Sequence, residues 1–532
     1  MITTGNDAFE TDSRTATASD GPHTGTNALG TITLVCVALF MLMLDMTIVA
    51  TALPDIQATF AGSLSDLQWV IDAYTLPIAS LLLTAATFGD RVGRRRLFLV
   101  GMTVFSAASL ACALSQDMLS LNIFRAVQGA GAVMLFGVAL PLVAAATPDP
   151  AARSRAIGVV GAVMATASVM GPLVGGALVE SLGWQSIFVI NVPIGIVAVA
   201  IAARVIGESR DEKAEQPDWP GTALLTTGLF AGVLVLVQGN DWGWTSVRTL
   251  GLAAMALALL VGFAVWESMC PQPLLDLRLL LRPAYTALLL AAAASGAGLI
   301  AVSTFLALYF MNTLGYSPLE AGLRVLPMSA AGLLAAPVAA VTYSSVRMRW
   351  SMPLGLAAIG IGLWLCTGVE AQDDWLHFVP GMTLAGLGLG AVTAVAAQGS
   401  LESAESRRTG MATGAVNSAR QIGIAIGIAA LGALLHNRSA IRAEELLAQQ
   451  PLTRNMSAGP AAELVDALGS GAGLRVLDFV PDQPSFVTPM LTKIATAVSA
   501  YGIDSVLAAA AAGTLVTAAL VAVLLQLDRR YR

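Results

Sequence analysis

Three ionisable residues, Asp45, Asp72 and Arg125, lie deep within apolar stretches of this 532-residue chain. Each falls six to nine residues from the predicted end of its stretch. At about 1.5 Å per helical residue, all three would lie roughly 9–14 Å below the same membrane face, so they could meet. A buried carboxyl group resists ionisation, whereas a neighbouring arginine favours it. The residues favour a site that binds and releases a proton, and the alternative is a structural ion pair that orders helix packing.

The composition indicates a membrane protein. Hydrophobic residues make up 56% of the chain and charged residues only 12%, which is unlike an ordinary soluble protein. A membrane-spanning helix needs about 20 apolar residues, and such runs recur with short polar breaks. The four cysteines show no CxxC spacing and the three histidines are far apart. Neither a metal site nor a disulfide framework is therefore predicted.

We predict an all-α membrane protein with fourteen transmembrane helices, arranged as two six-helix bundles with two linker helices between them. The predicted spans are 29–53, 66–88, 96–114, 118–147, 155–182, 187–206, 219–238, 247–266, 283–311, 318–343, 350–369, 375–398, 409–435 and 497–526.

Polar segments divide the chain into four parts. The predicted parts are a disordered cytoplasmic tail (1–28), an N-terminal six-helix bundle (29–207), a linker with two extra transmembrane helices (208–282), and a C-terminal six-helix bundle (283–532). The last part includes a long polar stretch, 436–496, which we expect to form an external loop apart from any central cavity.

The distribution of positive charge predicts the orientation. Arg91, Arg94, Arg95 and Arg96 lie within six residues between two apolar runs. Short loops rich in arginine stay on the cytoplasmic side of a membrane. With the N-terminus inside, most of the 28 Lys and Arg residues fall in cytoplasmic segments. Both termini are therefore predicted to be cytoplasmic.

Several motifs resemble those of the fourteen-helix drug:proton antiporter branch of the major facilitator superfamily. They lie, in chain order, at 44–49 with 52–56, 68–74, 125–131, 171–176 and 316–323, and the loop 89–96 resembles the superfamily's loop between helices 2 and 3. Ala167 departs mildly from the family pattern, which often has glycine there. The resemblance covers nearly the whole chain outside the tail and the long loop, and it implies the major facilitator fold.

The resemblance also implies roles for individual residues. They are proton coupling for Asp45, Asp72 and Arg125; gating of the cytoplasmic face for Gly89, Asp90, Arg91, Gly93 and Arg94, against the helix start near Arg407 and Arg408; and an antiporter motif for Gly171, Pro172, Gly175 and Gly176. Small residues let helices approach closely in lipid, and a proline can bend a helix. Plain helix packing explains the three glycines equally well.

Five further residues are candidates for lining a cavity: Trp69, Gln128, Asn417, Arg420 and Gln421. Asn417, Arg420 and Gln421 share one face of the predicted helix 409–435. A charge at that depth is expected to face the interior of the bundle. An aromatic residue such as Trp69 more often serves packing or anchors the interface.

The resemblance implies an exporter of the bacterial inner membrane that exchanges an external proton for a largely apolar drug or antibiotic. We expect a monomer in the lipid bilayer, with a small-molecule substrate and protons as partners and with no cofactor, metal or nucleic acid. Export of an endogenous small metabolite fits the same sequence. A transport-like sensor and a polytopic membrane enzyme are less favoured; the chain has no HExxH and no nucleophile elbow.

Overall fold

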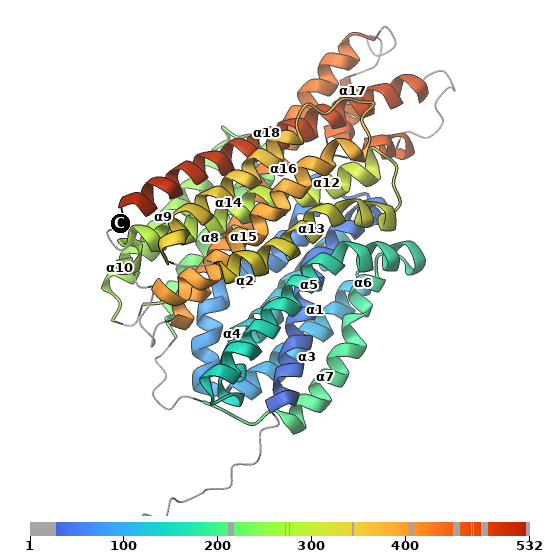
Figure 1. The fold of residues 1–532 in the computed structure, drawn as a ribbon. Coiled ribbons are helices and arrows are strands. Elements are labelled where there is room, and N and C mark those ends of the chain that lie inside the picture. The colour runs from blue at the N-terminus through green and yellow to red at the C-terminus, as the bar shows by residue number, and fades with distance from the viewer. Residues whose placement is uncertain are drawn as a thin grey trace, which may run out of the picture.

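The computed structural model describes residues 28–210, 217–271, 273–275, 277–342, 345–403, 409–450, 458–469, 471, 473–479 and 488–527. All regular structure in these residues is helical (Figure 1). Thirteen of the described helices are long and apolar enough to cross a membrane. The helix α5, with 33 residues from Pro150 to Leu182, completes a set of fourteen and agrees with the predicted fold class.

The first bundle consists of the helices α1 to α7. They are α1 (Ala28–Phe60), α2 (Leu64–Val92), α3 (Arg94–Ala113), α4 (Met118–Ala146), α5 (Pro150–Leu182), α6 (Ser186–Val189) and α7 (Asn191–Val205). Side-chain caps fix where several begin: Ser63 and Asp66 form a capping box on α2, and Asp117 and Asp149 cap α4 and α5. Each cap satisfies an amide that would otherwise lack a partner at the helix start.

Two linker helices, α8 (Trp219–Trp242) and α9 (Val247–Met269), form a hairpin that is followed by the short α10 (Leu277–Leu280). The helix α8 contacts both α2 and α16, while most side chains of α9 face away from the protein. The Thr84 and Thr222 hydroxyls lie 2.6 Å apart, and the Asn240 amide donates to the Ala433 carbonyl at 3.0 Å. The hairpin therefore braces both bundles.

The second bundle consists of α11 to α18. Its elements are α11 (Pro283–Ser295), a π-helical turn η1 (Gly296–Ile300), α12 (Ala301–Asn312), α13 (Pro318–Val341), α14 (Ser345–Leu365), η2 (Trp375–Phe378), α15 (Val379–Ser403), α16 (Thr409–Ala448), α17 (Ala458–Gly469), η4 (Gly473–Phe479) and α18 (Thr488–Leu527). The two bundles lie side by side in Figure 1, and α17 marks one end of the molecule. We call this end the α17 end and the opposite one the Gly93 end.

The region predicted as a polar loop, 436–496, is largely helical where the structure describes it, so that prediction was wrong in part. The helix α16 continues to Ala448, and α18 already begins at Thr488. The reason is a separate hydrophobic cluster, the α17 cap, which these helix ends form with α17 and η4. Its buried members are Ala443, Leu447, Leu464, Leu468, Val476, Leu491, Ile494, Ala495 and Val498.

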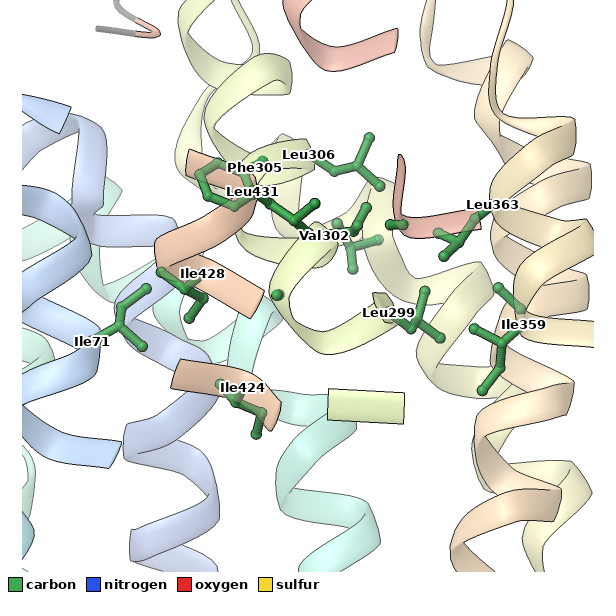
Figure 2. Close-up of a cluster of buried hydrophobic side chains, with 14 of the residues drawn as sticks. Ile71, Leu299, Val302, Phe305, Leu306, Ile359, Leu363, Ile424, Ile428 and Leu431 are labelled. Carbon is green, nitrogen blue, oxygen red and sulfur yellow. The ribbon is translucent and has the colours of Figure 1, made fainter. Parts of the chain in front are cut away.

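The bundles meet mainly along two pairs of helices, α2 with α16 and α5 with α13, and α1 also contacts α12 and α13. Figure 2 shows Ile71 of α2 facing Ile424 and Ile428 of α16, within a buried cluster that extends into α12 and α14. Buried apolar contacts across the centre of the molecule thus hold the two bundles together.

Candidate functional site

An ion pair between Asp45 of α1 and Arg125 of α4 lies at the centre of the first bundle. The Arg125 Nη1 atom is 2.6 Å from Asp45 Oδ2, and the exposed fractions of the two side chains are 1% and 0%. The sequence predicted this contact from the depth of each residue, and the contact is confirmed.

Three polar residues complete the coordination of this pair. Gln128 Nε2 and Asn191 Nδ2 donate to Asp45 Oδ1 at 2.8 and 3.1 Å, and Arg125 Nη1 also donates to Gln128 Oε1 at 2.7 Å. Gln128 Nε2 donates in addition to Ser109 Oγ at 2.7 Å. Both Asp45 oxygens are therefore bound by donors. Ser109 and Asn191 were not predicted from the sequence, although each is a polar residue within an apolar run.

The Arg125 guanidinium makes further contacts beyond the ion pair. Its Nε donates to the Val70 carbonyl at 2.9 Å, and its Cζ lies 4.3 Å from the ring centroid of Tyr74 and 5.7 Å from that of Phe188. A buried charge is tolerated only when it is paired and fully hydrogen-bonded, and the aromatic rings add a cation–π attraction. These contacts stabilise a buried ion pair within the membrane-spanning part of the protein.

Asp72 does not join this network. It is fully buried, and among the described residues no side chain donates a hydrogen bond to either of its carboxyl oxygens. It lies one helical turn from Gln68, whose amide donates to the Ile428 carbonyl of α16 at 2.7 Å, and one turn from Leu76, which packs against α8 and α16. The expectation that all three ionisable residues meet was therefore wrong for Asp72, because its helix face turns toward α8 and α16.

A cavity of about 80 Å³ lies between the two bundles. Most of its wall is apolar, with a few hydroxyl groups, and Tyr74 and Arg125 connect it to the buried ion pair. The lining residues are Met46, Thr47, Ala50, Thr51, Ile71, Tyr74, Thr75, Arg125, Pro172, Ile300, Ser303, Thr304, Ala307, Ala321, Val325, Met328, Ser329, Ile424 and Ile428. Its composition, apolar side chains with a few placed polar groups, is that of a site for a small organic molecule. No described residue of 436–496 lines it.

None of the five predicted lining residues belongs to this wall. Trp69 packs on Phe230 of α8, with ring centroids 5.4 Å apart, and Gln128 binds the ion pair instead. The amide of Gln421 lies 3.6 Å from the Met46 sulfur. The remaining two, Asn417 and Arg420, also lie on α16; Asn417 is exposed and Arg420 is half-buried. The sequence pattern predicts which residues share a face of a helix, but it does not predict which neighbouring helix packs against that face.

The antiporter-motif glycines of α5 lie where other helices approach closely. A Cβ at Gly171 would collide with Thr47 of α1, and one at Gly175 would collide with Thr51. A Cβ at Gly176 would lie 2.5 Å from Leu319 Cα of α13. On the opposing helix, a Cβ at Gly322 would collide with the carbonyl of Pro172. Gly171 and Gly175 therefore let α5 pack closely on α1 within the first bundle. Gly176 and Gly322 allow close contact between α5 and α13, which belong to different bundles.

The arginine-rich loop contacts the segment after α7. Asp90 and Arg94 form an ion pair of 2.7 Å, and Gly93 has a φ of 123°, which favours glycine. The Arg94 amide donates to the Ser209 carbonyl at 3.0 Å, and Arg95 donates to Glu208. The other two predicted gating residues frame the loop: Gly89 packs against Val138, and Arg91 is exposed. The expected partners Arg407 and Arg408 lie outside the described residues.

The described residues form two bundles of long helices and a linker hairpin, with a cavity between the bundles and a buried ion pair beside it. This arrangement defines a multi-pass membrane transporter. The family model for the Major Facilitator Superfamily matches residues 35–428. The chain belongs to this superfamily of transporters.

Three proteins that are similar to this chain are named for resistance to drugs or antibiotics. The chain is 34% identical to the multidrug resistance protein Stp of Mycobacterium tuberculosis over 75% of its own length and 74% of that protein's. It is 32% identical to the tetracenomycin C resistance and export protein of Streptomyces glaucescens, over 83% and 82%. It is 33% identical to the methylenomycin A resistance protein of Streptomyces coelicolor, over 77% and 86%.

A solved structure shares the fold. It is a bacterial homologue of the human lysosomal transporter Spinster in an inward-facing, unoccupied conformation, with a TM-score of 0.64 and 16% sequence identity. The match covers 95% of this chain and 98% of that one.

Proposed function

We propose that the protein exports hydrophobic drugs or antibiotics across the bacterial inner membrane in exchange for protons. The observation that carries this proposal is the contact between a largely apolar cavity and a buried carboxylate–arginine pair: Arg125 both lines the cavity and binds Asp45. The resistance and export functions in the names of the relatives support the same cargo class.

The coupling follows from competition for Asp45. As a carboxylate, Asp45 accepts hydrogen bonds from Arg125, Gln128 and Asn191. A proton on Asp45 cancels its attraction for the guanidinium, and Arg125 then turns into the cavity and occupies space that cargo would fill. Binding of a proton and binding of cargo thereby oppose each other through a coupling free energy that acts in both directions.

Asp72 is a second candidate proton carrier. An ionised carboxylate without a donor is costly in a low-dielectric interior, so this conformation fits a protonated Asp72. Its neighbours Ile71 and Thr75 line the cavity. We propose that Asp72 adapts the pump to cationic cargo, which a carboxylate attracts.

The α17 end is proposed to be external and closed in this conformation. Glu180 of α5 accepts hydrogen bonds from the Ser317 hydroxyl at 2.8 Å and from the Leu319 amide at 3.3 Å. Arg475 of the α17 cap binds Asp55 at 3.1 Å and the Pro54 carbonyl at 2.6 Å. These bonds join the bundles opposite to the arginine-rich loop, which the positive-inside bias places in the cytoplasm.

The remaining assignments rest on the sequence pattern. We propose that both termini are cytoplasmic, that the protein acts as a monomer, and that the chain divides at residues 28, 207 and 282. We also propose that Asp90 and Arg94 help to close the Gly93 end in the alternate conformation.

Flux through the purified protein tests the function. In liposomes, an imposed pH gradient should drive accumulation of at least one compound from a panel of antibiotics and cationic dyes. Cells with and without the chain, challenged with the same panel, identify the compound first. Absence of pH-driven flux for every compound to which the chain confers resistance would overturn the proposal.

A further inference from the structure

Two buried carboxyl groups meet at the base of the linker hairpin, far along the chain from the Asp45–Arg125 pair. Asp218 precedes α8 and caps it, and Glu267 lies in the last turn of α9. Only 7% of Asp218 and 3% of Glu267 is exposed. A Cβ at Gly221 would touch both Asp218 Oδ2 and Glu267 Oε1, so these two oxygens crowd the same small space.

The two carboxyl groups have different hydrogen-bond partners. Asp218 accepts from the Gly221 amide at 3.0 Å and from Trp266 Nε1 at 2.9 Å on Oδ1 and 3.1 Å on Oδ2. Glu267 Oε2 accepts from the Leu275 amide at 3.1 Å. Glu267 Oε1 is buried and receives no donor from the described residues, although the Asp218 carboxyl group lies within its hydrogen-bonding reach.

Charge decides the state of this pair. Two carboxylates in contact repel each other, and burial removes the water that would screen them. Within the described part of the chain, no basic side chain forms an ion pair with either group, and the charged group that acts on Glu267 is Asp218. One proton must therefore remain between them. Both Asp218 oxygens already accept hydrogen bonds, so the proton belongs on Glu267 Oε1, the buried oxygen that lacks a donor.

We propose that Asp218 and Glu267 form a second proton-binding site, in which Glu267 Oε1 donates its proton to the Asp218 carboxylate. The bound proton joins the start of α8, the end of α9 and the segment at Leu275 that leads into the second bundle. Since α8 is bonded to α2 through Thr222 and to α16 through Asn240, the site fastens the brace between the two bundles. Loss of the proton at high pH leaves two adjacent carboxylates and loosens this brace.

Infrared spectroscopy on the purified full chain in lipid nanodiscs tests the site. A pH titration should show the carbonyl stretch of a buried carboxylic acid that disappears in Glu267→Gln. The band should persist in Glu320→Gln, which removes a half-exposed carboxyl group of α13. In Asp218→Asn the neighbouring charge is gone, so the Glu267 band should vanish at a lower pH than in the unsubstituted protein. A spectrum of Glu267→Gln that retains every acid band would overturn the proposal.

Thermal unfolding gives an independent measurement. The folded pair holds a proton that the unfolded glutamate releases more readily, so stability should be highest at low pH and should fall as the pH rises through the titration. Glu267→Gln, whose amide still donates to Asp218, should lose this part of the pH dependence. A pH dependence identical in Glu267→Gln and Glu320→Gln would refute a shared proton. Neither measurement requires transport, so the result is independent of the proposed exchange of drug for protons.

Discussion

Replacement of Asp45 by asparagine is the sharpest test of the ion pair, because an amide cannot satisfy its surroundings in either orientation. With its oxygen toward Arg125, the new NH₂ group faces the donors of Gln128 and Asn191, which lie 2.8 and 3.1 Å from the present oxygen. With the amide reversed, the NH₂ group faces Arg125 Nη1 across 2.6 Å. Asp45→Asn therefore leaves donors unpaired in both cases.

The size of the effect follows from burial. Removal of one partner from a buried ion pair costs about 3–5 kcal/mol, and each 1.4 kcal/mol corresponds to roughly a tenfold change in an equilibrium constant. The conformation in which Arg125 lies against position 45 should therefore lose about two to four orders of magnitude in relative population. Asp45→Asn also removes the group that exchanges the proton.

The assay compares two fluxes in the same liposomes. Accumulation of a resistance compound driven by a pH gradient should be abolished in Asp45→Asn, while exchange of labelled for unlabelled compound without a gradient should continue. Asp149→Asn is the matched control, since asparagine caps a helix as well as aspartate does and Asp149 only caps α5. If Asp45→Asn still builds a compound gradient from a pH gradient, the assignment of Asp45 as the coupling group is wrong.

Three further predictions concern the remaining contacts. Asp72→Asn should change the unfolding temperature little, because neither oxygen has a hydrogen bond to lose, and should reduce resistance to cationic compounds more than to neutral ones; equal loss for both would contradict its role. Arg475→Gln should open the α17 end, measured as a longer spin-label distance between α5 and α13, while Arg442→Gln, whose partner lies within α16, should leave that distance unchanged. Gly176→Ala places a methyl group 2.5 Å from Leu319 Cα and should lower resistance severalfold at normal expression, unlike Gly158→Ala, where no atom lies within 4 Å.

The sequence predicted the central ion pair because the depth of a residue below a membrane face can be counted along its helix. Asp45 and Arg125 lie at similar depth on helices that pack together, so counting residues was sufficient. The same count placed Asp72 at that depth, but its direction depends on which helix covers its face, and the linker helix α8 was not assigned a position around the bundle. The sequence therefore predicts the depth of each residue, but it does not predict how each helix is rotated about its own axis relative to its neighbours.

Contacts between distant segments escaped prediction for a related reason. Asp218 and Glu267 are 49 positions apart in the sequence, and each alone resembles an ordinary polar residue at the end of a span. Only the closure of the α8–α9 hairpin brings them together. The α17 cap was missed because its apolar residues are spread among polar ones, so its average composition hides a small core of its own.

The length of α16 has a practical consequence. At about 1.5 Å per residue, its 40 residues extend roughly 60 Å, about twice the thickness of the hydrocarbon layer. Its middle carries Ile424 and Ile428 in the cavity wall, and its last turns carry Ala443 and Leu447 in the α17 cap. If α16 tilts slightly at the cavity, its far end at the α17 cap is displaced by a larger distance. A fluorophore attached near Ala448 would therefore report cavity occupancy optically from the aqueous side, without a label near the cargo.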